Sequence, residues 1–148
     1  MAMDILHCRT ALRLCCAGLL FAGMLTADDA AIVARNAWVR LPLPSQRDAA
    51  MYVILENHSQ QRRAVVSGSS EAAASVELHE MKMDHMVMHM NPVAEVKIPA
   101  KGKASFNPDG YHIMLFSLKT RPAVGDSITV TLKLDDGSKV PVTGTVRK

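Results

Sequence analysis

The sequence His79-Glu80-Met81-Lys82-Met83-Asp84-His85-Met86-Val87-Met88-His89-Met90 reads as two short β-strands joined by a tight turn at Asp84-His85. Side chains of a strand alternate between its two faces, and opposed residues of an antiparallel pair point the same way. Such a hairpin carries His79 and the thioether side chains on one face, and Glu80, Lys82, Val87 and His89 on the other. Its predicted opposed pairs are His79 with Met90, Met81 with Met88, and Met83 with Met86. A three-residue turn that includes Met86 is the alternative, and it would shift these pairs by one position.

Outward from this hairpin, the chain shows short β-type runs separated by turn residues and no long apolar pattern of helical period. The predicted strands cover residues 31–41, 50–56, 64–67, 76–83, 86–93, 95–98, 103–106, 111–118, 127–134 and 139–146. A helical turn is expected around residues 72–74, and core positions are expected for Trp38 and Met51. Pro92 indicates a sheet edge or the end of pairing. The pattern predicts one all-β domain, either an antiparallel sandwich or a small Greek-key barrel.

The N-terminus has the features of a secretory signal, with Arg9 and Arg13 before the short apolar run 14–25. We expect residues 1–27 to be a cleaved signal peptide and residues 28–148 to be the mature domain. The apolar run is shorter than the ~20 residues that span a bilayer, so stable membrane insertion is not expected. Lipidation at Cys15 or Cys16 is disfavoured, because Arg13-Leu14 stands where small residues would be expected.

Cleavage would leave the mature chain without a thiol, since Cys8, Cys15 and Cys16 all lie in the leader. This excludes a blue-copper site, a cysteine-based zinc site and an iron–sulfur cluster. Methionine and histidine can bind metal in an oxidising compartment without the hazard of disulfide formation. The formal net charge of the full chain is only +3 and its basic residues are scattered, so nucleic-acid binding is not expected.

Five methionines and three histidines fall within residues 79–90, and thioether sulfur together with imidazole nitrogen suits a soft ion, Cu(I) above all. A second element adds His112 and Met114, which share one face of a strand because they are two residues apart. Two nitrogens and two sulfurs could then surround one ion, and spacing alone does not choose between Met88 and Met90. The other hairpin donors are either auxiliary ligands or ordinary packing and surface residues. They are Met81, Met83, Met88, His85 and His89.

The spacing of His79, Met90, His112 and Met114 resembles the H-x10-M-x21-H-x-M signature of the periplasmic copper chaperones of the PCu(A)C family. The likeness extends along the mature chain, through residues 37–40, 76–81, 87–88, 108–114 and 125–126. It implies a cupredoxin-like antiparallel β-sandwich with Greek-key topology and a Cu(I) site formed by those four residues. Two departures stand out: members commonly have a glycine in the turn where this chain has Asp84-His85-Met86, and we expect the chain to lack the His/Met-rich tail that some members append. His85 and His89 are candidates for binding Cu(II) in place of that tail.

The resemblance implies a periplasmic, monomeric metallochaperone that delivers Cu(I) to the binuclear copper site of cytochrome c oxidase subunit II, alone or with a Sco-type protein. No nucleophile or activating base is evident, so we expect no enzymatic activity. A copper scavenging, storage or tolerance protein is the main alternative. A copper redox enzyme and a β-sandwich interaction module with methionines as its contact surface are further alternatives.

Overall fold

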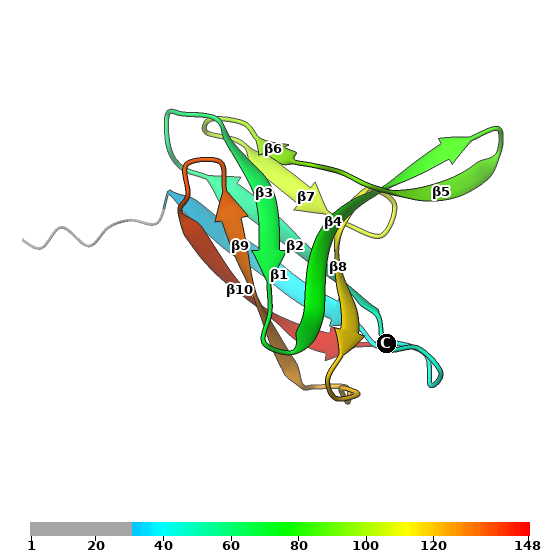
Figure 1. The fold of residues 1–148 in the computed structure, drawn as a ribbon. Helices are drawn as coiled ribbons and strands as arrows, with labels where there is room; N and C mark the ends of the chain where they lie inside the picture. Colours follow the sequence, from blue (N-terminus) through cyan, green and yellow to red (C-terminus); the bar gives the residue numbers. More distant parts are fainter. Residues whose placement is uncertain (1–30) are drawn as a thin grey trace, which may run out of the picture.

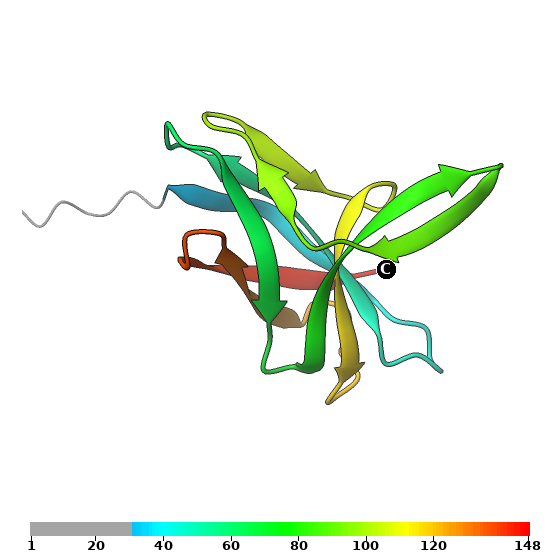
Figure 2. The same cartoon turned by 45° about the horizontal axis from the view of Figure 1, so that its top comes forward.

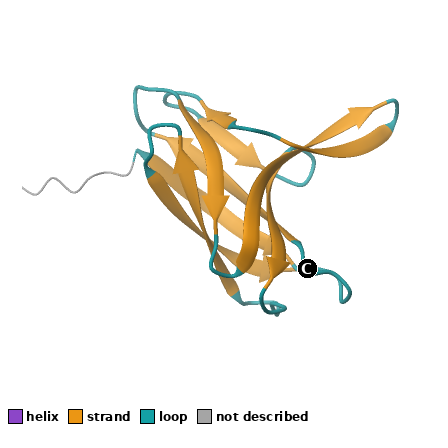
Figure 3. Cartoon of the chain, in the orientation of Figure 1, coloured by secondary structure: helices purple, strands orange, loops and turns teal. Residues whose placement is uncertain are grey.

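The computed structural model describes residues 31–148, so the predicted signal peptide and the three cysteines lie outside the described residues. Every regular element in this part of the chain is a β-strand (Figures 1 and 3). The strands are β1 (Ile32–Arg40), β2 (Ala49–Asn57), β3 (Arg63–Ser69), β4 (Ala73–Asp84), β5 (Val87–Pro92), β6 (Val96–Ile98), β7 (Lys103–Phe106), β8 (Tyr111–Leu118), β9 (Ser127–Leu134) and β10 (Lys139–Arg147). Within residues 31–148, no helix has the length and apolar character that a membrane crossing requires.

The strands follow the order β5-β4-β8-β7-β2-β1-β10-β9-β3-β6, with additional pairings of β4 with β3 and of β8 with β2. Because β4 contacts both β8 and β3, the sheet curls back on itself into a barrel-like sandwich (Figure 2). The predicted all-β class is confirmed, while the cupredoxin-like Greek-key description stays a prediction. The helical turn expected at residues 72–74 is wrong. Ala73 already begins β4 and pairs with Leu118, and this pairing overrides the local preference of the small residues.

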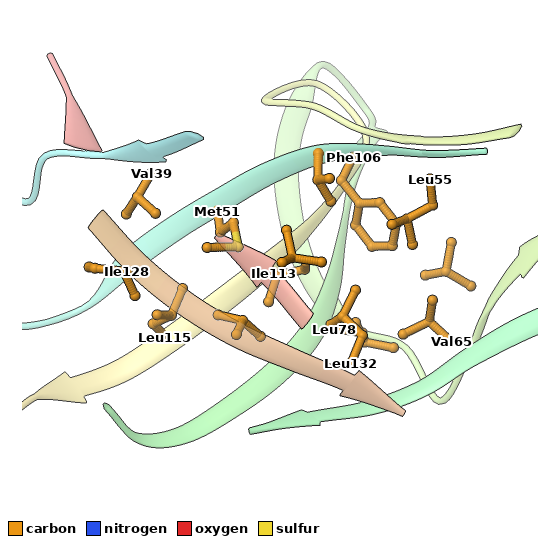
Figure 4. Packing of buried hydrophobic residues seen from close by; sticks show 14 of the residues in the cluster. Val39, Met51, Leu55, Val65, Leu78, Phe106, Ile113, Leu115, Ile128 and Leu132 are labelled. Carbon is orange, nitrogen blue, oxygen red and sulfur yellow. The ribbon is translucent and has the colours of Figure 1, made fainter. Parts of the chain in front are cut away.

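The core lies inside the closed sheet and forms from the inward-facing residues that alternate along its strands (Figure 4). In β9, for example, Ile128, Val130, Leu132 and Leu134 are all buried while their neighbours face outward. Each large apolar side chain buried in this way contributes roughly 1.5–3 kcal/mol relative to an exposed one. Met51 is fully buried in this cluster, as predicted.

Trp38 lies on the outer face of β1, which corrects its predicted place in the core. Its neighbour Val39 takes the inward position, since side chains alternate along the strand. The indole packs on the ring of Tyr52 at a centroid distance of 4.5 Å, and the guanidinium of Arg147 lies 5.5 Å from its centroid. The tryptophan therefore contributes to an aromatic surface beside the sandwich rather than to its interior.

The hairpin of β4 and β5 extends beyond the body of the sandwich as an arm (Figures 1 and 2). All six residues of β5 are exposed, and β5 is an edge strand that ends at Pro92, in agreement with the prediction for this proline. The predicted strands and their shared face are present, but the register differs from the prediction.

The turn of the arm consists of His85 and Met86, so Asp84 pairs with Val87 rather than lying in the turn. Met81 consequently pairs with Met90 and Met83 with Met88, while His79 lies opposite Pro92. This register differs from the predicted one by two residues, and a shift of two preserves the face to which each side chain points. Both turn residues have positive φ, 46° for His85 and 65° for Met86, as expected for a tight two-residue hairpin turn.

Candidate metal centre

The two predicted histidine ligands lie side by side on the outer face of the sheet. His79 of β4 pairs directly with His112 of β8, and the centroids of their rings are 5.8 Å apart. Only 7% of His79 and 3% of His112 is exposed. Leu78 and Ile113 beside them point into the core, which holds the two strands in place beneath the imidazoles. Residues distant in the sequence thus meet through the β4–β8 pairing.

Each imidazole has one nitrogen engaged by the protein and one that accepts no protein hydrogen bond. His79 Nε2–H donates to Glu77 Oε2 at 3.0 Å, and His79 Nδ1 is buried without a hydrogen-bond partner. His112 Nδ1–H donates to the carbonyl oxygen of Gly110 at 3.2 Å, which leaves Nε2 with the lone pair. A hydrogen bond from the second ring nitrogen to a carboxylate or a carbonyl is the usual arrangement of a metal-binding histidine. In the neutral form of each ring, this arrangement leaves Nδ1 of His79 and Nε2 of His112 with the lone pairs that can bind a metal.

The environment of His112 also favours its neutral form. Burial lowers the pKa of His112, the Gly110 hydrogen bond opposes this shift, and the neighbouring His79 adds to it. Because a metal binds the neutral imidazole, a lowered pKa keeps Nε2 of His112 available for metal binding at a lower pH.

Three methionines lie on the same strand faces as the histidine pair. Met114 is two residues from His112 and Met81 is two residues from His79, while Met90 lies directly opposite Met81. Met81, Met90 and Met114 line one open cleft of about 770 Å³, together with residues such as Tyr52 and Pro108. Met90 is half exposed, so the sulfur side of the centre faces solvent. Met81 is placed as closely to this cleft as Met90, so the geometry alone does not choose between them.

The remaining predicted donors lie farther out on the arm. Met83 and Met88 form the next opposed pair, and both are exposed. His89 lies opposite Lys82, one position along each strand, and therefore on the other face of the arm. His85 is in the turn, where its Nδ1 lies 2.7 Å from Asp84 Oδ1. The pairing thus places His89 away from the histidine pair and leaves His85 at the far end of the arm.

Sequence reasoning missed the carboxylate that orients His79. Two other acidic residues of β4 lie near His79 in the sequence, but Glu80 pairs with Lys82 at 2.7 Å and Asp84 lies beside His85. Glu77 fills this role because it lies two residues before His79, on the same strand face. That spacing in the sequence was the signal that could have identified it.

The donor set favours a soft ion. Among residues 31–148, no group of three or more His, Cys, Asp or Glu side chains is placed to hold a metal ion. A metal bound by the histidine pair would therefore take its further protein ligands from the neighbouring thioethers, and thioether sulfur prefers Cu(I). The donor types present fit such an ion.

The comparison with protein families gives a match over nearly all of the described chain. The sequence model of the family described as "Putative lipoprotein LpqE-like" matches residues 32–146. The chain belongs to the LpqE-like family. This LpqE-like chain is 33% identical over 108 residues to the protein named Putative lipoprotein Lxx21020 of Leifsonia xyli subsp. xyli. The match covers 72% of this chain and 64% of the relative, so the chain spans less than two thirds of that relative's length.

Solved structures share the fold of this LpqE-like chain. The Cu(I) form of DR1885 from Deinococcus radiodurans is 37% identical, with 78% of this chain and 77% of that chain covered and a TM-score of 0.58. The copper-bound PCuAC domain from PmoF2 is 20% identical, with 79% and 92% covered and a TM-score of 0.66, a likeness that concerns the fold alone. The resemblance to the PCu(A)C family is thereby confirmed.

Proposed function

We propose that the protein is a non-enzymatic metallochaperone that binds Cu(I) through His79, Met90, His112 and Met114. The observation that carries the proposal is the buried His79 Nδ1, which has no hydrogen-bond partner and belongs to a ring paired with His112. A buried polar atom without a partner costs free energy, and a bound metal ion would satisfy it. Met81 is the alternative sulfur ligand to Met90, because the two lie opposite each other in the same cleft.

The donors suit transfer of a metal ion rather than its permanent retention. All four are neutral, and the thioether side opens to solvent while the imidazole side is buried. A recipient can therefore approach from the cleft and add a ligand while a methionine dissociates. The copper remains Cu(I) throughout, so the exchange needs no oxidant or reductant. Copper is thus the cargo of the protein.

The relatives support copper as this cargo and export as the route. DR1885 has been solved with Cu(I), and the name of the LpqE-like family describes lipoproteins. We propose that the protein is a periplasmic monomer. Its proposed fold is a cupredoxin-like Greek-key sandwich. Its proposed recipient is the binuclear copper site of cytochrome c oxidase subunit II, with a Sco-type protein as a further partner. The signal sequence, and with it the choice between cleavage and lipidation, stays a prediction.

Copper transfer in vitro tests the proposal. The Cu(I)-loaded protein is mixed anaerobically with the apo copper domain of cytochrome c oxidase subunit II, and the copper content of each protein is measured after separation. We expect copper to move to the recipient from the wild-type protein, while His79→Ala/His112→Ala should not load with Cu(I) at this centre. Tight binding without transfer would contradict the chaperone function but retain the metal centre.

Copper storage is the second candidate, and the exposed thioethers on the arm are the observation that favours it. Met83, Met86 and Met88 add sulfur beyond the needs of one centre. A deletion strain distinguishes the two functions. Low oxidase activity at limiting copper indicates delivery, whereas normal oxidase activity with greater copper sensitivity indicates storage.

A further inference from the structure

The outer end of the arm carries a second pair of thioethers that the candidate centre does not use. Met83 and Met88 are directly opposed across β4 and β5 and share the face of the arm that leads to the histidine pair. Both are exposed, Met83 at 70% and Met88 at 43%. Neither contributes to the buried hydrophobic cluster of the sandwich. Packing therefore does not explain why two methionines occupy these positions.

The placement of the two side chains permits both sulfurs to bind one ion. Directly opposed residues in an antiparallel pair have Cβ atoms about 4.5–5.5 Å apart. Methionine is unbranched and flexible, so its sulfur can turn toward the space between the strands. Cu(I) has the softness that favours thioethers and imposes little coordination geometry. A cross-strand methionine pair thus supplies a small, sulfur-only donor set.

This pair is separate from the candidate centre. The Met81–Met90 pair lies between it and the histidines, two residues nearer along each strand. Met83 is four residues from His79 along β4, a span of about 13 Å, so one ion cannot bind both the outer pair and the histidines. The charged and imidazole side chains of this segment, Lys82 and His89, lie on the opposite face of the arm. On the face that Met83 and Met88 share, thioethers are consequently the only donor side chains of this opposed pair.

We propose that Met83 and Met88 form a second Cu(I) site, weaker than the histidine centre and independent of it. The weaker binding follows from its two thioether donors, its exposure and its lack of imidazole. The site should reject Zn²⁺, because zinc sites in proteins use thiolate, imidazole or carboxylate ligands rather than thioether.

Anaerobic Cu(I) titration of the protein, with its methionine methyl groups labelled with ¹³C, tests this proposal. We expect the first equivalent of Cu(I) to shift the methyl signals of the histidine centre, and the second to shift those of Met83 and Met88. Met83→Leu/Met88→Leu should lose the second equivalent and keep the first. Leucine preserves the apolar character and approximate volume of the side chains, so the arm should keep its structure.

The matched control is His89→Gln, which changes an exposed donor of the same arm on its other face. This variant should keep both equivalents of Cu(I). The proposal is overturned if the second equivalent is absent, if it survives in Met83→Leu/Met88→Leu, or if it is lost in His89→Gln. His79→Ala/His112→Ala separates the two sites, since it should lose the tight equivalent and retain the methyl shifts of Met83 and Met88. Failure of tight binding in the wild-type protein would contradict the proposed function without affecting this result.

Discussion

Glu77 is the residue that orients the ring of His79. Its carboxylate accepts the Nε2–H hydrogen bond, fixes the tautomer and leaves Nδ1 with the lone pair. Replacing such a partner of a ligand histidine typically lowers metal affinity about 10- to 100-fold. We therefore predict that Glu77→Ala weakens Cu(I) binding within that range in competition with a Cu(I) chelator. Glu80→Gln is the control, because Glu80 pairs with Lys82 and should leave affinity unchanged.

The lowered pKa of His112 gives the apo protein a specific pH dependence. Burial is the main cause of the shift, so the unfolded chain binds a proton more tightly than the folded chain does. The contribution of His112 to stability is present above the ordinary imidazole pKa of about 6.5 and is lost as the pH falls through and below it. We predict that urea unfolding shows this loss between neutral and mildly acidic pH. His112→Gln should show a smaller dependence, and an identical profile for the two proteins would contradict the assignment.

At the scale of the element, the turn of the arm is unusual in lacking glycine. His85 and Met86 both adopt positive φ, a conformation that costs a non-glycine residue roughly 1–2 kcal/mol. Asn-Gly is the sequence preferred in a turn of this type. We predict that His85→Asn/Met86→Gly increases the hydrogen-exchange protection of amides in β4 and β5 near the turn. Affinity at the histidine centre should not change, since the turn lies far along the arm. Reduced protection would show that the turn residues stabilise the arm in another way.

The strands could be predicted well from the sequence because alternation of apolar and polar residues directly reflects the two faces of a sheet. The register of the arm could not, because no glycine marked the turn at His85 and Met86. The shared face of the methionines was nevertheless correct, since the error was two residues and side chains repeat every two. The direct pairing of His79 with His112 depends on contact between distant strands, which local pattern does not determine.

At the scale of the whole molecule, the candidate metal centre and the core lie on opposite faces of the same strands. Ile113 lies in the core, whereas His79 and His112 face outward. We predict that His79→Ala/His112→Ala keeps the β-type circular dichroism spectrum and cooperative unfolding. Ile113→Ala should instead destabilise the fold by about 2–5 kcal/mol, because it creates a cavity in the core. Loss of cooperative folding in the histidine variant would contradict this separation of site and core.

The closed sheet also positions the two histidines. Closure of the sheet through β3 and β4 brings β4 and β8 together, and this pairing assembles the histidines. The carbonyl of Gly110 strengthens the same junction, since it accepts hydrogen bonds from the backbone of Met81 and from the ring of His112. The sandwich thus brings together the proposed ligands from two separated segments.

The most direct test of the central claim is copper X-ray absorption on the protein loaded with one equivalent of Cu(I). The proposed centre predicts a Cu(I) edge and a first coordination shell that contains both imidazole nitrogen and thioether sulfur. His79→Ala/His112→Ala should lose the nitrogen contribution. A shell of nitrogen and oxygen without sulfur, or of sulfur alone in the wild-type protein, would contradict the assignment of the histidine and methionine ligands.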